Sequence, residues 1–278
     1  MIKAVQIPVS DDFARECEYA RDAGFEYISV GFTRVLGKTS DEWRRLTDDI
    51  GNLFAALGLK CVQSHPHYYN PFLSSDVRDE ELERSMREAI SASANLGAEY
   101  CVFHPRTAIS SGYSVAVSLE NNKMWFSELL ECAVKSGTRI AAENLPIFPS
   151  SNKIAPLFSS NPDHLISLVD SFSDDSIGIC WDFGHANLLA GDQSRMIESM
   201  GERIRCTHIH NNFGYRDDHS PVMCGNIDWS RAMSALSSIG YSGPLTLETE
   251  CLYTDEGMRR SFYKNGYESL EFLYGLSK

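Results

Sequence analysis

Short apolar runs alternate with longer amphipathic runs along almost the whole chain, and this alternation restricts the fold more than any other feature. The short runs are rich in β-branched and apolar residues, as strands buried on both faces are. They cover residues 2–8, 25–31, 59–65, 99–105, 139–144, 177–182, 203–210 and 244–250. We therefore expect eight parallel strands joined by helical crossovers.

The intervening runs have the length and charge pattern of surface helices. We expect helices over residues 11–24, 40–58, 78–97, 122–137, 161–172, 228–239 and 257–275, and a weaker one over 191–201. A left-handed C-terminal cap favours glycine, and the first four helices end on Gly24, Gly58, Gly97 and Gly137. Turns from helix to strand are thus short. Loops from strand to helix are long, over 66–77, 105–117, 144–160 and 211–227.

Eight such units favour closure into a single (β/α)8 TIM barrel that occupies residues 1–278 as one domain. A barrel of this kind takes about 250 residues, and the chain has 278. The alternative is an open, doubly wound α/β sheet. No G-x-G-x-x-G motif follows the first strand, so the dinucleotide-binding form of that sheet lacks support. In a barrel the long loops lie on one face, and that face carries the chemistry.

The net charge and the cysteine spacing limit the classes of binding partner and the cellular compartment that we expect. The formal net charge is −13, which repels phosphate backbones and anionic membranes. We therefore expect neither a nucleic-acid nor a membrane partner. No two of the eight cysteines show C-x-x-C spacing, and the N-terminus lacks the apolar stretch of a signal peptide. These features favour a cytoplasmic protein with reduced thiols, and they leave open whether it forms a homo-oligomer.

Seven of the eight histidines lie at or just beyond the ends of predicted strands, together with several carboxylates. The histidines are His65, His67, His104, His185, His208, His210 and His219, and the carboxylates are Glu143, Asp182, Asp217 and Glu248. Barrel strands bring their carboxyl ends around one axis, so we expect these side chains to converge. A scatter over helix surfaces would not produce this pattern.

Four of these residues end four consecutive strands: Glu143, Asp182, His208 and Glu248. Three carboxylates crowded in a low-dielectric mouth would repel one another and take up protons. A divalent cation removes that cost, and one imidazole with three carboxylates suits Mn²⁺, Zn²⁺, Co²⁺ or Mg²⁺. We therefore predict a divalent metal ion at these four residues.

The chain resembles the xylose isomerase-like barrel superfamily, which includes sugar phosphate isomerases and epimerases. The motifs that carry the resemblance are "HPHYYN" (65–70), "FHP" (103–105), "AEN" (142–144), "WDFGHA" (181–186), "HIHN" (208–211), "RDDH" (216–219), "GNIDW" (225–229) and "LTLETE" (245–250). The resemblance implies a carbohydrate substrate and a single metal at Glu143, Asp182, His208 and Glu248. It implies substrate contacts from His185 and Arg216, and we expect His65, His104 and His210 to join them.

The ligand pattern of trinuclear apurinic-site endonucleases, which belong to the same superfamily, can also be placed on the chain. Its positions fall on His65, His104, Glu143, Asp182, His185, His208, Asp217, His219 and Glu248. Asp217 and His219 are therefore candidates for an additional metal. The net charge and the absence of Lys/Arg clusters in the loops of the mouth argue against a grip on DNA.

Two positions depart from the pattern common among epimerases of the superfamily. Ser29 stands where these relatives often carry a glutamate at the end of strand 2, and His210 and Asn211 replace the last two residues of an H-x-K-D motif. No predicted strand ends on lysine, whereas xylose isomerases proper use such a lysine, two metals and a hydride shift. The sequence thus favours proton transfer and leaves the sugar open.

The expected chemistry is isomerisation or epimerisation of a sugar, sugar phosphate or cyclitol through a metal-stabilised enediolate. Glu143 and Glu248 would remove and return the proton. The alternatives are a dehydratase acting on a cyclitol or keto-sugar, an apurinic-site endonuclease, and a non-catalytic metal- or carbohydrate-binding module. Cations in the loops could reach a substrate phosphate: Arg34, Lys38, Arg106, Lys153 and Arg216.

Overall fold

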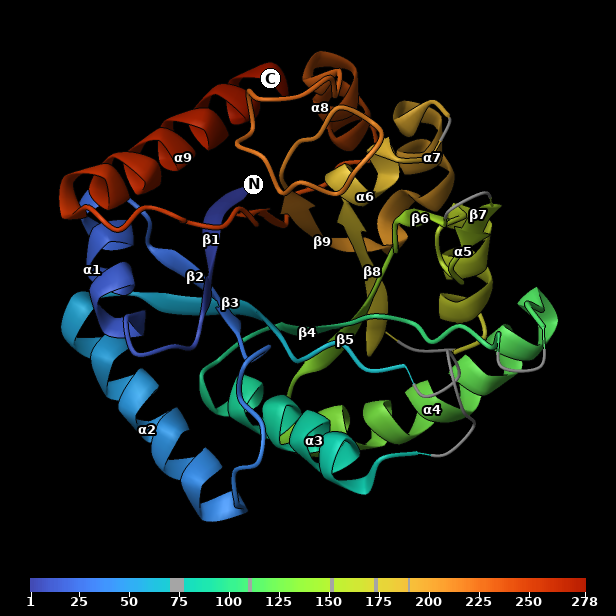
Figure 1. Ribbon diagram of the computed structural model, residues 1–278, viewed down its shortest axis with the longest axis horizontal. Coiled ribbons are helices and arrows are strands. Elements are labelled where there is room, and N and C mark those ends of the chain that lie inside the picture. The colour runs from blue at the N-terminus through green and yellow to red at the C-terminus, as the bar shows by residue number, and fades with distance from the viewer. Residues whose placement is uncertain (71–77, 110–111, 151–152, 173–174, 190) are drawn as a thin grey trace.

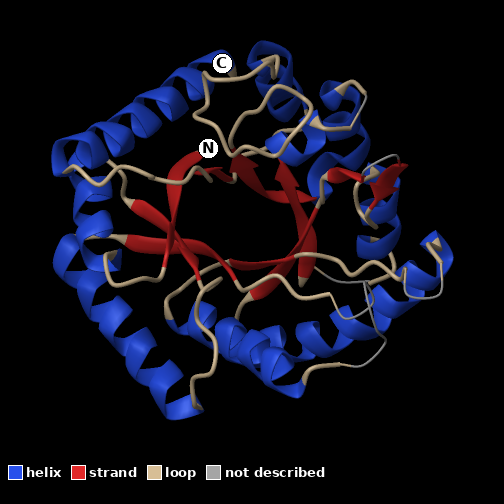
Figure 2. Cartoon of the chain, in the orientation of Figure 1, coloured by secondary structure: helices blue, strands red, loops and turns tan. Residues whose placement is uncertain are grey.

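Eight parallel strands close into a barrel, and helices surround it (Figures 1 and 2). The computed structural model describes residues 1–278 except 71–77, 110–111, 151–152, 173–174 and 190, with the backbone alone for 148–150 and 153–156. The barrel strands are β1 (Ile2–Pro8), β2 (Tyr27–Gly31), β3 (Lys60–His65), β4 (Tyr100–Phe103), β5 (Arg139–Glu143), β8 (Ile177–Asp182), β9 (Ile204–Ile209) and β10 (Pro244–Leu247). Each lies within one predicted strand, so the predicted TIM barrel is confirmed.

The first and last strands complete the ring. β1 pairs with β10 from Ile2↔Pro244 to Val5↔Leu247, and the Ile2 amide donates to the Gly243 carbonyl at 3.1 Å. Going round the ring, the order is β1-β10-β9-β8-β5-β4-β3-β2. Strands β5, β8, β9 and β10 are therefore successive neighbours, which is the arrangement that the predicted metal ligands require.

The helices pack around the strands as the sequence predicts. They are α1 (Phe13–Ala23), α2 (Ser40–Leu57), α3 (Glu80–Asn95), α4 (Val115–Ser136), α5 (Pro162–Val169), α6 (Phe183–Asn187), α7 (Gln193–Met200), α8 (Trp229–Ser238) and α9 (Glu256–Leu276), with a 3₁₀ turn over Gly201–Arg203. The four predicted glycine caps all have positive φ, from +69° at Gly58 to +110° at Gly24. Among the described residues, no helix is long and apolar enough to cross a bilayer.

Two local predictions were wrong, and one short helix was not predicted. Helix α4 begins at Val115 rather than 122, because the Ser114 hydroxyl caps it by accepting from the Val117 amide. The predicted loop 144–160 contains an antiparallel pair, β6 (Ile147–Ser150) and β7 (Lys153–Pro156). The short helix α6 directly follows β8, because the Asp182 carboxylate accepts from the His185 amide at 2.6 Å.

Alternation along the strands divides the core into two layers. A small cluster consists of Tyr100, Val102, Ala141, Cys180 and Cys206. A much larger cluster includes residues of both strands and helices, and contains Trp181, which is 1% exposed. Neighbouring residues of a strand point to opposite faces, so Cys180 and Asp182 share the face opposite to Trp181. This places Asp182 on the inner side of the barrel, at its mouth.

Candidate metal centre

The strand ends carry the predicted ligands to one region of the barrel. Glu143 is the last residue of β5 and Asp182 the last of β8, whereas His208 lies near the end of β9 and Glu248 directly follows β10. Asp182 and His208 are paired in the ladder between β8 and β9. The side chains of Glu143, Asp182 and His208 are at most 1% exposed, and that of Glu248 is 15% exposed.

His208 lies at the centre of the first cluster, which we call the central cluster (Glu143, Asp182, His208 and Glu248). Its Nδ1 lies 3.0 Å from Glu143 Oε1, 3.0 Å from Glu248 Oε2 and 3.8 Å from Asp182 Oδ2. One donor atom from each of the four residues lies within 4.8 Å of all the others. The structure thus brings together the four residues that the sequence singled out as metal ligands.

A second cluster shares Glu143 with the first. The Oε2 atom of Glu143 lies 3.0 Å from His65 Nε2 and 2.9 Å from His104 Nε2. His65 ends β3, and His104 follows β4. The Glu143 carboxylate therefore has histidines on both oxygens, which is the position of a carboxylate that can bridge two metal ions.

The third cluster contains three histidines and one carboxylate: His185, His210, Asp217 and His219. Asp217 Oδ2 lies 3.2 Å from His185 Nε2 and 3.3 Å from His219 Nε2. Its Oδ1 lies 3.9 Å from His210 Nδ1. The backbone at His219 has φ +44°, a conformation that is uncommon for a non-glycine residue and is often found at functional sites.

The outer ring nitrogens of these histidines are held by acceptors, which fixes the orientation of each ring. Nδ1 donates to a backbone carbonyl in His65 (Pro66, 2.7 Å), His185 (Asn144, 2.8 Å) and His219 (Glu248, 3.0 Å). His210 turns its Nε2 to Asp182 Oδ2 at 3.0 Å. Such contacts leave the other nitrogen free to face a metal, and they are typical of metal-binding histidines.

Close packing also holds His210 in place. An added Cβ at Gly184, in α6, would lie 1.9 Å from Cε1 of His210. Position 184 therefore has to be glycine for the imidazole to lie where it does. The "WDFGHA" segment supplies the predicted ligand Asp182, the space at Gly184 and the cluster residue His185.

The charges in the mouth compensate one another. Burial alone raises the pKa of the Glu143 carboxyl, but the charges and hydrogen bonds of His208 and His104 outweigh it and hold that pKa well below its usual range. Burial lowers the pKa of His219, but the hydrogen bond to Asp217 and the charge of Glu248 raise it to about 9. The pKa values of His208 and His219 are raised, so these two imidazoles offset the carboxylate charges, a role that a bound cation would take over.

The donor set fits a divalent metal ion. Three carboxylates and one imidazole surround one point in the central cluster, and this is a hard-to-borderline set. In the third cluster, His210 Nδ1 and Asp217 Oδ1 are buried and have no hydrogen-bond partner among the described residues. Buried polar atoms without partners are costly. Both observations favour cation binding at these clusters.

Several expected residues lie outside the clusters. The Arg216 side chain is 78% exposed and pairs with Asp218 at 2.5 Å. His67 is buried but belongs to none of the three clusters. Arg106 is 1% exposed and pairs with Glu83 rather than facing the mouth. The Lys153 side chain lies outside the described residues.

Two residues of the site were not predicted. Gln6, in β1, donates from Nε2 to Glu248 Oε1 at 2.5 Å. Asn144 exchanges two hydrogen bonds with the backbone of Asp182, of 2.9 and 2.7 Å. Glutamine inside the apolar run "IKAVQIP" was a signal for the first, because a buried amide needs a partner. Asn144 is the last residue of the "AEN" motif, but no spacing rule relates it to Asp182.

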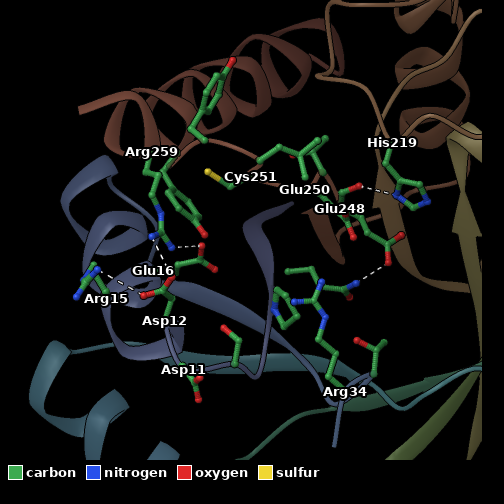
Figure 3. Close-up of a pocket in the computed structure, with 18 of the residues that line it drawn as sticks. Asp11, Asp12, Arg15, Glu16, Arg34, His219, Glu248, Glu250, Cys251 and Arg259 are labelled. Carbon is green, nitrogen blue, oxygen red and sulfur yellow. Dashed lines mark hydrogen bonds and ion pairs between the residues drawn. The ribbon is translucent and has the colours of Figure 1, made fainter. Parts of the chain in front are cut away.

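An open cavity of about 930 Å³ borders the central cluster through Glu248 and the third cluster through His219 (Figure 3). It extends toward α1 and α9, between the segments that follow β1, β2 and β10. A ligand in this cavity can therefore reach Glu248. The other three residues of the central cluster are more deeply buried.

Curated proteins that are related in sequence include MJ1311 and y4fM. MJ1311 of Methanocaldococcus jannaschii is 32% identical over 170 residues, which cover 59% of this chain and 55% of that protein. The alignment thus spans about half of that relative. The protein y4fM of Sinorhizobium fredii is 29% identical over 252 residues, which cover 82% of this chain and 78% of that protein.

Solved structures of an epimerase-like protein and of sugar epimerases share the fold over the full length. A D-tagatose 3-epimerase-like protein has a TM-score of 0.74 at 22% identity and covers 99% of both chains. D-psicose 3-epimerase, solved with D-fructose, has a TM-score of 0.75 at 13% identity, covering 100% of this chain and 99% of its own. The 3-keto-D-glucoside 4-epimerase of E. coli has a TM-score of 0.73 at 13% identity, covering 99% and 100%. Identities this low demonstrate a common fold alone.

A family match agrees with this fold and covers most of the chain. Residues 17–268 match the family described as xylose isomerase-like TIM barrel. These residues include every member of the three clusters. The chain therefore belongs to the xylose isomerase-like TIM barrel family.

Proposed function

We propose that the protein is a divalent-metal-dependent isomerase or epimerase that acts on a sugar or a closely related polyol. The observation that carries the proposal is the convergence of Glu143, Asp182, His208 and Glu248 beside an open cavity. The likeness to sugar epimerases supports the substrate class. A bound cation would polarise the substrate carbonyl and acidify the neighbouring C–H bond.

Two carboxylates from different strands would carry the proton. Glu248 borders the cavity, so we assign it the removal of the proton next to the carbonyl. Glu143 approaches His208 from β5, and we assign it the return of a proton. General acid–base catalysis requires such groups within hydrogen-bond reach of the reacting carbon. His185 and His210 would hold substrate hydroxyls if the third cluster carries no metal.

The proposal is tested by exchange with solvent deuterium. The Mn²⁺-loaded protein is incubated in D₂O with a panel of aldoses, ketoses and cyclitols, and deuterium at the carbon next to the carbonyl is measured by NMR. We expect exchange with at least one compound of the panel. We expect Glu143→Gln and Glu248→Gln to lower its rate by about 10²–10⁴-fold, the usual contribution of an acid–base group.

Glu250 offers a matched control for these variants, because it lies on the same cavity wall but in none of the clusters. Glu250→Gln should leave the exchange rate of a monosaccharide unchanged. Metal content is measured for every variant, so that loss of metal is separated from loss of the acid–base group. Sugar binding without exchange throughout the panel would instead favour the non-catalytic module, and loss of water from the substrate would favour the dehydratase.

A second candidate function rests on the shared carboxylate. Glu143 joins two clusters, and a third cluster with Asp217 and His219 lies beside them, so the mouth offers ligands for more than one metal. Paired metals stabilise both the attacking and the leaving oxygen in phosphoester hydrolysis. We therefore include a duplex with one abasic site in the assay. Its cleavage by the Zn²⁺-loaded protein, with no deuterium exchange in any sugar, would replace the first proposal with the endonuclease.

A further inference from the structure

The cavity is much larger than the part of a substrate that the metal centre can hold. Its volume of about 930 Å³ lies at the upper end of the range for small-molecule sites, roughly 300–1,000 Å³. Glu248 lies at the end nearest to the candidate metal centre, and Arg259 lies on α9 (Figure 3). Gln6 lies beside Glu248, to which it donates a hydrogen bond. A single sugar whose carbonyl lies at Glu248 would leave most of this space to water.

The charges along the wall disfavour an anion. Apart from Glu248, the lining carries four carboxylates and three arginines. Arg259 is 8% exposed and is already neutralised, since it bonds Asp12 at 3.1 Å and Glu16 at 2.6 Å. Arg15 pairs with Asp12 at 3.4 Å. A phosphate carries a charge of about −1.5 to −2 at pH 7, and two of the three arginines that could attract it are already paired with carboxylates.

The same wall suits hydroxyl groups. Arg34 forms no ion pair with any described residue, and the exposed carboxylates of Asp11 and Glu250 lie on the same wall. Thr33 and Thr254 add hydroxyls that both donate and accept. Sugar hydroxyls also donate and accept, so a neutral polyol can pair with donors and acceptors that a phosphate could use only in part. The aromatic ring of Tyr253, which is 48% exposed, adds an apolar surface for a sugar ring.

We propose that this cavity is a subsite for a second, uncharged sugar unit. The preferred substrate is then a glycosylated keto-sugar rather than a free or phosphorylated monosaccharide. The glycosyl group lies between the segments after β1, β2 and β10, and the carbonyl end reaches Glu248. This inference rests on the proposed function for which end of the substrate faces Glu248. The subsite itself is tested by binding measurements alone.

The subsite is tested with three probes that differ only in the substituent on O6 of fructose. They are D-fructose, D-fructose 6-phosphate and isomaltulose, in which a glucosyl group replaces the phosphate on O6. Binding to the Mn²⁺-loaded protein is measured by isothermal titration calorimetry. We expect isomaltulose to bind at least tenfold more tightly than fructose, and fructose 6-phosphate to bind no more tightly than fructose.

A variant that fills the cavity tests whether the preference for isomaltulose over fructose arises in the proposed subsite. Thr33→Trp puts a large ring into the subsite and should abolish the difference in affinity between isomaltulose and fructose. Leu36→Trp is the matched control, because Leu36 lies in the same segment, is 48% exposed and does not line the cavity. Leu36→Trp should keep the full preference. Circular dichroism verifies that both variants are folded.

Three results would overturn the subsite: equal affinity for isomaltulose and fructose, tighter binding of the phosphate, or an unchanged preference in Thr33→Trp. Deuterium exchange in D₂O is measured on the same samples. Isomaltulose that binds with the expected preference but does not exchange would leave the subsite intact and remove proton transfer on ketoses. Deuterium exchange without any preference for isomaltulose would support proton transfer and refute the subsite. The two proposals can therefore fail separately.

Discussion

Glu248 is held from two sides, and this fixes the direction of its carboxylate. Gln6 donates to Oε1 at 2.5 Å, and His208 lies 3.0 Å from Oε2. The Ser29 hydroxyl in turn donates to Gln6 Oε1 at 3.1 Å, across the ladder between β1 and β2. Ser29 is the residue that stands where epimerases of the superfamily often have a glutamate. The chain thus uses a hydroxyl and an amide to orient Glu248.

Removing the amide should slow proton transfer more than it weakens binding. In Gln6→Leu, Glu248 loses the donor to Oε1 and can rotate, and loss of such an outer contact costs about 10–100-fold in activity. We expect kcat to fall within this range while KM for the sugar changes little. Steady-state kinetics measure both, and Ser29→Ala should cause a smaller loss because its contact is one step removed. A fall confined to KM would contradict the positioning role.

Gly184 provides a test of how His210 supports the metal ligands. Gly184→Ala places a methyl group 1.9 Å from the imidazole, so the ring has to move and its hydrogen bond to Asp182 is lost. We expect the affinity for Mn²⁺ to fall by about 10–100-fold, as measured by calorimetry. The control is Gly51→Ala in α2, whose added Cβ meets only the Leu96 side chain at 3.9 Å. Equal affinities in the two variants would refute the role of His210.

At the scale of elements, a buried ion pair joins α3 to the segment that follows β4. Glu83 is 3% exposed and bonds Arg106, while Arg78 pairs with Glu83 at 3.0 Å. The Arg106 guanidinium lies 3.5 Å from the centre of the Trp125 ring on α4. This pair therefore ties two helices to a segment that starts at His104, a member of the second cluster.

Breaking the pair should destabilise the fold. Glu83→Gln removes the carboxylate charge that faces the buried Arg106 guanidinium, which costs about 3–5 kcal/mol of unfolding free energy. Urea denaturation at pH 7 measures this loss. Glu128→Gln is the matched control, because Glu128 bonds the same Arg78 from an exposed position and should cost less than about 1 kcal/mol. Similar losses in both variants would contradict the importance of burial.

The same pair predicts a dependence on pH. Burial raises the pKa of Glu83, but the hydrogen bond from Arg78 and the charge of Arg106 outweigh it, so the net pKa is lowered. A lowered pKa contributes stability that is complete above the unfolded value of about 4.5 and is lost as the pH falls through the folded value. The stability difference between wild type and Glu83→Gln should therefore shrink below pH 4.5. A difference that stays constant to pH 3 in urea titrations would contradict this.

The sequence predicted the elements better than their ends. Strands β1 and β8 have their predicted bounds, because each is a mostly apolar run between clear breaks. The start of α4 was missed because its first turn, "VAVS", has no amphipathic pattern and depends on the cap at Ser114. The convergence of the central cluster followed from strand order alone. The pairing of Gln6 with Glu248 could not be predicted from strand order, because it depends on how far the two side chains reach across the closed ring.

At the scale of the whole molecule, the proposed metal joins four strands that are distant in sequence. Its ligands come from β5, β8, β9 and the residue after β10. A ligand that binds only the folded state stabilises it by about 2.7 kcal/mol at a concentration of 100 Kd. Binding should therefore raise the melting temperature of the entire barrel rather than of one loop.

We expect Mn²⁺ or Zn²⁺ to raise the melting temperature of the metal-free protein and EDTA to reverse the effect. Differential scanning calorimetry measures the shift, and elemental analysis gives the number of ions bound. The variant Asp182→Asn should show a smaller shift, because a neutral amide binds the cation less strongly than a carboxylate. A metal-free protein whose melting temperature does not respond to either ion would argue against the centre. A count above one ion per chain would favour the multinuclear alternative.

The pairing of β1 with β10 also determines when the protein can fold during synthesis. One edge of β1 has no strand partner until residues 244–247 have been synthesised, since these residues complete the ring. Until then the nascent chain holds an apolar strand with unsatisfied backbone groups, a known risk for aggregation. The acidic residues that follow β10 arrive at the same moment. The synthesis of β10 and of the residues after it therefore does two things at once: it pairs the edge of β1, and it completes the carboxylates of the mouth.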